Sequence, residues 1–124
     1  MFELKVTGKF AAAHQLKMVG EKCENLHGHN FKVEAYVAGE ALNDAGVLLD
    51  FGIVKAALKE IVGGVDHKFL NEMAPFKESS ASSENIAVHI ATELQKAVDS
   101  EGVCVSRIRV WESDNACVTY HPKK

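Results

Sequence analysis

Hydrophobic residues recur with two different periods along this chain, and the order of those periods restricts the fold that it can adopt. Alternation of apolar and polar residues indicates strands, whereas apolar residues three or four positions apart indicate helices. The strand-like stretches are residues 2–7 continuing into 10–14, 29–38, 103–111 and 116–120, and the helical stretches are 51–62 and 84–98. This order predicts an α+β fold with elements in the sequence order ββααββ, in which two helices cover one face of a four-stranded antiparallel sheet.

Residues at the ends of the helical stretches agree with this assignment. Asp50 precedes the first helix and either Ser82 or Ser83 precedes the second, and all three are favoured N-cap residues. Gly63 is the expected stop of the first helix. A sheet of this size leaves two free edges, which predicts a homo-oligomer joined through them.

The composition indicates one domain spanning residues 1–124 and excludes several classes of protein. The length suits a single core, and the net charge of −3 lacks the basic footprint of nucleic-acid-binding proteins. No apolar stretch is long enough to span a bilayer, and the N-terminus lacks the apolar core of a signal peptide. The three cysteines are odd in number and are expected to be free thiols. We therefore expect a cytoplasmic protein without nucleic-acid or membrane partners.

The segment from Cys23 to His29, CENLHGH, holds the densest set of metal-binding and acid–base residues. Residues two apart in a strand point to the same face, roughly 6.5–7 Å apart, so His27 and His29 can bind one ion. His14 ends another strand-like stretch and can approach from a neighbouring strand. Three imidazoles leave one position open on a tetrahedral ion, as in catalytic zinc sites, although imidazole also binds copper, iron and nickel. Two alternatives are histidines without a metal and a structural zinc site closed by Cys23.

Six motifs in order resemble the 6-pyruvoyl-tetrahydropterin synthase superfamily, and most closely its 6-carboxy-tetrahydropterin synthase branch in the queuosine pathway. They are FAAAH (10–14), CENLHGH (23–29), LDFGIVK (49–55), VDHKFLN (65–71), SSEN (82–85) and WES (111–113). The resemblance implies the tunnelling fold, a hexamer whose sheets join into a barrel, and zinc on His14, His27 and His29. It also implies conversion of 7,8-dihydroneopterin triphosphate to 6-carboxy-5,6,7,8-tetrahydropterin, acetaldehyde and triphosphate. Alternatives are a 6-pyruvoyl-tetrahydropterin synthase, a promiscuous pterin side-chain aldolase, and a non-catalytic structural zinc module.

The resemblance also implies roles for single residues. Cys23 becomes the catalytic base, and a nearby cation would favour its thiolate. Asp66 and His67, which by sequence alone are more typical of a cap or a solvated loop, become a proton relay to Cys23. Glu112 becomes the anchor of the pterin ring, since one carboxylate can accept two adjacent N–H groups. The substrate-binding residues expected beside it are Ser82, Ser83 and Phe51, whereas His89 and His121 are expected to be structural.

Overall fold

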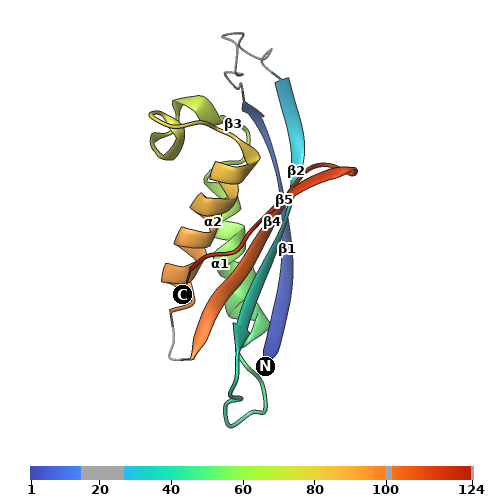
Figure 1. Cartoon of the computed structure of the whole chain (residues 1–124), viewed down its shortest axis with the longest axis vertical. Coiled ribbons are helices and arrows are strands. Elements are labelled where there is room, and N and C mark those ends of the chain that lie inside the picture. The colour runs from blue at the N-terminus through green and yellow to red at the C-terminus, as the bar shows by residue number, and fades with distance from the viewer. Residues whose placement is uncertain (15–26, 100–101, 124) are drawn as a thin grey trace.

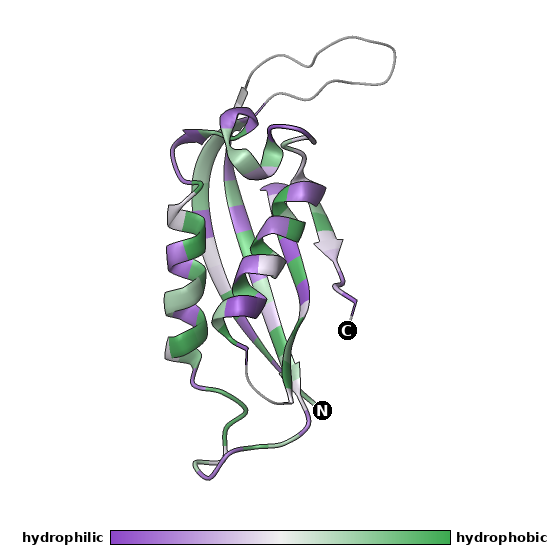
Figure 2. Cartoon of the chain, turned by 90° about the vertical axis from the view of Figure 1, so that its left-hand side faces the viewer, coloured by the Kyte–Doolittle hydropathy of each residue, from purple (hydrophilic) through white to green (hydrophobic). Residues whose placement is uncertain are grey.

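The computed structural model describes residues 1–14, 27–99 and 102–123, with the backbone alone at position 27. Five strands form one sheet in the spatial order β3-β1-β2-β4-β5, and both helices lie on one face of it (Figures 1 and 2). The strands are β1 Phe2–His14, β2 His27–Gly39, β3 Lys68–Phe69, β4 Val103–Ser113 and β5 Ala116–Tyr120. The helices are α1 Phe51–Gly63 and α2 Ser83–Ala97, with short 3-10 helices η1 Leu70–Glu72 and η2 Ala74–Phe76 between them. The predicted α+β class is confirmed.

The two long strands β1 and β2 pair along their whole length and carry the framework of the sheet. Their antiparallel register runs from Phe2 opposite Gly39 to His14 opposite His27. Alternate side chains of the sheet, such as Phe31, Val33 and Ile108, are buried against the helices. The described residues therefore share one hydrophobic core between the sheet and the helix layer.

The helices begin where the sequence predicts. The Asp50 carboxylate accepts the Gly52 N–H at 2.8 Å, and the Ser82 hydroxyl accepts the Asn85 N–H at 3.1 Å. These bonds satisfy N–H groups that the first helical turn leaves without a backbone partner. Ser82, and not Ser83, is thus the cap of α2. Helix α1 ends at Gly63 and its C-cap is Gly64, one residue beyond the predicted stop.

The structure contains one strand that the sequence did not indicate. Strand β3 pairs in parallel with β1 at Ala12 and Ala13, so the sheet is mixed and five-stranded. A two-residue strand is too short to show a period, and this one forms because the turn before it is bonded to β1. Cys104 and Cys117 are free, as expected. Among the described residues, no helix is both long and apolar enough to cross a membrane.

Candidate metal and active site

Three side chains from three strands meet at the end of the sheet where β1 stops. His14, His29 and Glu112 each offer a ligand atom, and these atoms lie within 4.8 Å of one another. The Glu112 Oε1 atom is 3.1 Å from His14 Nε2 and 3.0 Å from His29 Nε2. The His14 side chain is 1% exposed, His29 23% and Glu112 34%, so the cluster is closed on one side and open on the other.

Glu112 lies on the same face of β4 as the buried residues Ile108 and Val110, and it sits where β4 is irregular. In the β4–β5 ladder Trp111 pairs with Cys117 and Ser113 pairs with Ala116, so Glu112 is the extra residue of a bulge. Bulges are frequent beside functional sites. The pairing of β4 with β2 ends at Trp111, one residue before Glu112.

The buried His14 ring is held in one tautomer. Its Nδ1 lies 2.8 Å from the Ala81 carbonyl oxygen, which can only accept, so Nδ1 carries the proton. In the neutral ring Nε2 then presents its lone pair, and this is the nitrogen that faces Glu112. A backbone carbonyl that fixes the tautomer in this way is the usual outer partner of a metal-bound histidine.

The donor set fits a metal ion. With a neutral His14 ring, its Nε2 lone pair and the Glu112 carboxylate are two acceptors in contact, and only a cation or an added proton makes that contact favourable. Zinc binds imidazole nitrogen and carboxylate oxygen at about 2.0–2.2 Å, which places tetrahedral donors roughly 3.3 Å apart. The 3.0 and 3.1 Å contacts of Glu112 are close to that separation. His14, His29 and Glu112 can therefore hold zinc with small adjustments.

Asp66 and His67 form a second pair of acid–base side chains at the edge of β1. Asp66 Oδ1 accepts the Ala11 N–H at 2.8 Å and lies 3.0 Å from His67 Nδ1, while the His67 N–H donates to the Ala11 carbonyl. The Ala11 N–H, against a smaller opposing effect of desolvation and with help from His67, holds the pKa of Asp66 below its usual range. His67 has a φ of 59°, a backbone conformation that residues other than glycine rarely adopt and that occurs often at functional sites.

A shallow hollow is lined by one residue of each group. His29 of the cluster and His67 of the pair both line it, together with Lys68 and small residues of β1 and β2, and its volume is about 460 Å³. The His67 side chain is 81% exposed, so its ring is accessible from solvent. A hollow of this size lies within the range of small-molecule sites.

The other predicted site residues are distributed as follows. The His27 backbone lies in β2 opposite His14, but its side chain and the whole of Cys23 lie outside the described residues. Ser83 is buried, and its hydroxyl has no hydrogen-bond partner within the described part of the chain. Phe51 is half-exposed and begins α1 beside the N-terminal end of β1, roughly 40 Å of strand away from His14 (Figure 1).

Sequence reasoning did not place Glu112 beside the histidines. It assigned this residue to the pterin ring, because the resemblance implies that role and one carboxylate can accept two adjacent N–H groups. Nothing in the WES motif indicates the register of β4 on β2. The pattern of alternation could have placed Glu112 on the same face as His14 and His29 only once the strand order was known.

Comparison with known proteins gives consistent matches over nearly the whole chain. The family described as 6-pyruvoyl tetrahydropterin synthase matches residues 3–123. A 6-carboxy-5,6,7,8-tetrahydropterin synthase of Synechocystis is 39% identical over 71% of this chain and 70% of its own. One of Bacillus subtilis is 31% identical over 99% of this chain and 87% of its own.

Relatives with another activity are similar as well. A Homo sapiens 6-pyruvoyl tetrahydrobiopterin synthase is 38% identical over 85% of this chain and 73% of its own. The structure of Caenorhabditis elegans 6-pyruvoyl tetrahydropterin synthase superposes with a TM-score of 0.85, covering 98% of this chain and 96% of its own at 21% identity. At that identity the superposition establishes the shared fold.

Proposed function

Because the chain belongs to the 6-pyruvoyl tetrahydropterin synthase family, we propose that it is a zinc-dependent lyase acting on 7,8-dihydroneopterin triphosphate. The products are 6-carboxy-5,6,7,8-tetrahydropterin, acetaldehyde and triphosphate, and the reaction serves queuosine biosynthesis in the cytoplasm. The observation that carries this proposal is the convergence of His14, His29 and Glu112 at the open end of the sheet. The similarity to two 6-carboxy-5,6,7,8-tetrahydropterin synthases supports this branch of the family.

His14 and His29 are the proposed zinc ligands, with His27 or Glu112 as the third. Zinc at this site would supply Lewis acidity toward the vicinal hydroxyls of the substrate side chain. The Ala81 carbonyl keeps the proton on His14 Nδ1, so that the Nε2 lone pair would be the one to hold an ion. Burial of His14 prevents water from competing for that nitrogen.

Proton transfer is the proposed work of Cys23, Asp66 and His67. The Asp66 carboxylate accepts from His67 Nδ1, which leaves Nε2 of that ring to accept or release a proton at the hollow. The lowered pKa of Asp66 keeps its carboxylate charged, and this carboxylate orients the His67 ring. Cys23, four residues before His27, is the proposed base in contact with the substrate.

Substrate binding is assigned to four residues. Glu112 anchors the pterin ring, and its second oxygen, Oε2, is the atom proposed to accept from the ring, since Oε1 contacts the histidines. Ser82 and Ser83 lie in the segment after Ala81, which contacts His14, and the buried Ser83 hydroxyl has no partner among the described residues. Phe51 lies at the other end of its own sheet, so its role requires the site of a neighbouring subunit.

A homo-oligomer, a hexamer by resemblance, supplies that neighbouring subunit. Within the described residues β1 is paired on its outer side only at Ala12 and Ala13, which leaves most of that edge open. Strand β5 forms the opposite edge of the sheet. Strand β4 extends beyond β5, but there the Val105 N–H is already bonded to Gln95 Oε1 at 2.8 Å and is not free to pair with another strand. This favours β5 and β1 as the edges that join. Analytical ultracentrifugation of the full chain measures the mass directly.

Incubation of the zinc-loaded protein with 7,8-dihydroneopterin triphosphate tests the activity. Acetaldehyde together with the mass of 6-carboxy-5,6,7,8-tetrahydropterin supports the proposal. A pyruvoyl product without acetaldehyde would assign the chain to the pyruvoyl-forming branch, for which the similarity to the human enzyme is the supporting observation. No turnover by zinc-loaded protein would favour a structural zinc module.

Cys23→Ala separates catalysis from structure. Loss of a base should abolish turnover while zinc content and the melting temperature stay as in wild type. Loss of a structural ligand should release zinc and lower stability. Ser106, on the surface of β4, provides a matched small-residue control, and Ser106→Ala should leave turnover unchanged.

A further inference from the structure

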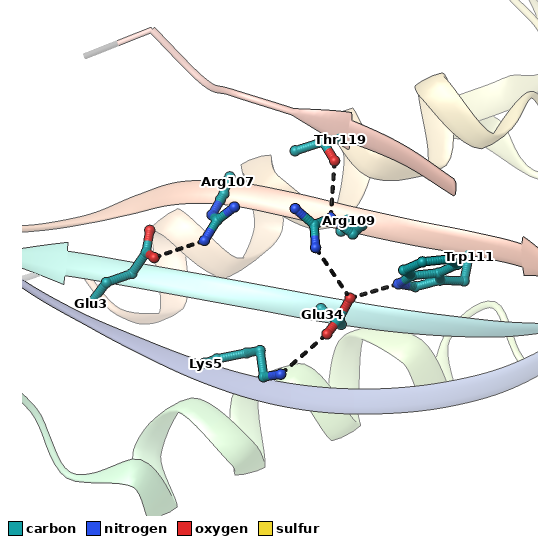
Figure 3. A network of polar contacts seen from close by, with 7 residues as sticks. All are labelled: Glu3, Lys5, Glu34, Arg107, Arg109, Trp111 and Thr119. Atoms are coloured by element: carbon teal, nitrogen blue, oxygen red, sulfur yellow. Dashed lines mark hydrogen bonds and ion pairs between the residues drawn. The ribbon is translucent and has the colours of Figure 1, made fainter. Parts of the chain in front are cut away.

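The face of the sheet opposite the helices carries a polar network that ends one residue before Glu112. Glu34, in the middle of β2, has a side chain only 8% exposed, although both described helices lie on the other face of the sheet (Figures 1 and 2). Figure 3 shows its polar partners. Its carboxylate accepts the Trp111 indole N–H at 2.6 Å and pairs with Lys5 at 3.3 Å. Arg109 Nη1 lies 3.8 Å from Glu34 Oε1, and Arg109 Nε donates to the Thr119 hydroxyl at 3.1 Å. The network therefore links β1, β2, β4 and β5.

The Glu34–Trp111 bond crosses the ladder diagonally. In the β2–β4 register Glu34 is opposite Arg109, and Trp111 is opposite Lys32. The indole thus reaches back by two residues to a carboxylate in the interior of the sheet. This bond fixes the last residue of β4 that is paired with β2, at the point where the backbone ladder ends.

Trp111 and Glu112 are neighbours that point to opposite faces of the sheet. Trp111 contacts Glu34 on one face, and Glu112 contacts the two histidines on the other. Strand alternation sends Glu112 toward the histidines, but the β2–β4 pairing ends at Trp111 and Glu112 is the unpaired residue of the β4–β5 irregularity, so neither ladder pairs its backbone. A rotation of β4 that carried Glu112 away from the histidines would pull the Trp111 indole off Glu34.

We propose that Trp111 and Glu34 are positioning residues whose hydrogen bond holds the Glu112 carboxylate against the two imidazoles. Burial raises the pKa of Glu34, but the Trp111 and Lys5 partners outweigh it and keep the pKa below its usual value, so the acceptor stays charged. Charge-assisted hydrogen bonds are shorter and stronger than neutral ones. The inference depends on the proposed function only through the role of Glu112.

The first test is made on metal-free protein and needs no activity. The ring ¹⁵N resonances of His14 and His29, recorded at one fixed pH, report their contact with Glu112. Trp111→Phe keeps an aromatic ring but removes the N–H, and it should move both resonances in the direction that Glu112→Ala moves them. Resonances of Trp111→Phe that coincide with wild type would overturn the proposal, whatever the enzyme does.

Substitutions of Glu34 separate positioning from general loss of stability. Glu34→Gln keeps an oxygen that can accept from the indole and should retain ring resonances like those of wild type, whereas Glu34→Leu should not. Glu3→Leu is the matched control, because Glu3 is also a carboxylate on this face, bonded to Arg107 at 3.0 Å, but lies at the far end of the sheet. Equal effects of the two leucine variants on the rings would contradict the inference.

Metal binding provides a second, independent measurement. Cobalt(II) added to apoprotein gives a visible spectrum, and Trp111→Phe should weaken the affinity by roughly 10-fold, as loss of outer-shell partners does. In a Glu112→Ala background, Trp111→Phe should weaken cobalt affinity by less than about twofold, because the two residues act through one contact. If Trp111→Phe weakened cobalt affinity as much in Glu112→Ala as in wild type, the proposed positioning role of Trp111 would be overturned. Cobalt binding that is normal in Glu112→Ala, with altered ¹⁵N rings in Trp111→Phe, would remove Glu112 from the ligand set and leave positioning intact.

Discussion

Two glutamates on opposite faces of one sheet have contrasting surroundings. Glu34 is almost fully buried and is surrounded by donors: an indole N–H, an ammonium and a guanidinium. Glu112 is one-third exposed and faces two imidazole nitrogens, of which the one on His14 lacks a proton in the neutral ring. A carboxylate saturated with donors holds strands together, whereas one placed against lone pairs is available to a cation. The contrast separates a structural network from a binding site made of the same residue type.

The strongest way to break this contrast is to remove a histidine from the Glu112 side. His14→Ala should lower zinc affinity by more than the roughly 10–100-fold that follows loss of an outer-shell partner, because it removes a ligand itself. Competition with a chromophoric chelator measures the affinity. His89→Ala is the control, since His89 is another partly buried histidine but packs on Phe76 between helix α2 and η2. Unchanged zinc affinity in His14→Ala would remove this cluster as the metal site.

On the Glu34 side the expected effect is on stability. Glu34→Leu leaves the Trp111 N–H without its acceptor and removes the partner of Lys5, which should lower the free energy of unfolding by roughly 1–3 kcal/mol. Urea denaturation followed by circular dichroism measures the change. Glu112→Leu should cost less on the same scale, because its side chain is more exposed and its metal-free contacts are weaker. Equal losses of stability in Glu34→Leu and Glu112→Leu would show that the Glu34 network does not stabilise the fold more than the contacts of Glu112.

The pH dependence of stability sharpens the same point. The folded pKa of Glu34 lies below its ordinary value of 4.5, so its charge stabilises the fold above that pH and the contribution is lost as the pH falls through the folded pKa. The difference in unfolding free energy between wild type and Glu34→Gln should therefore be constant near neutrality and shrink below about pH 4.5. Contributions of Glu3 and Asp66 cancel, because both proteins retain them. A difference that grows toward acid pH would contradict the assignment.

Much of this architecture could be predicted because it depends on local patterns. Period and capping residues located the four main strands, both helices and the cap at Asp50. Strand β3 could not be found, since two residues have no period and its position depends on Asp66 and His67 bonding to Ala11.

The site was only partly accessible to sequence reasoning for the same physical reason. His14 and His29 were found because histidines at strand ends are visible in a pattern, and the structure brings them together. The approach of Glu112 depends on the order and register of the strands, and the His14 side chain bonds the backbone carbonyl of Ala81, 67 positions away. Neither leaves a signal in composition or spacing. The roles of Cys23 and His27 stay predictions.

The smallest expected effect concerns two adjacent serines that the sequence could not tell apart. Ser82 caps α2 through the Asn85 N–H, so Ser82→Ala should lower the free energy of unfolding by about 1 kcal/mol. Ser83→Ala should be neutral or slightly stabilising, because the buried hydroxyl that it removes has no partner among the described residues. Thermal denaturation of the two metal-free variants measures the difference. If Ser83 instead binds substrate, Ser83→Ala should raise KM while stability stays unchanged, so the pair separates a structural serine from a functional one. Equal stabilities of the two variants would mean that the Ser82 cap contributes nothing measurable, and an unchanged KM would remove Ser83 from the substrate site.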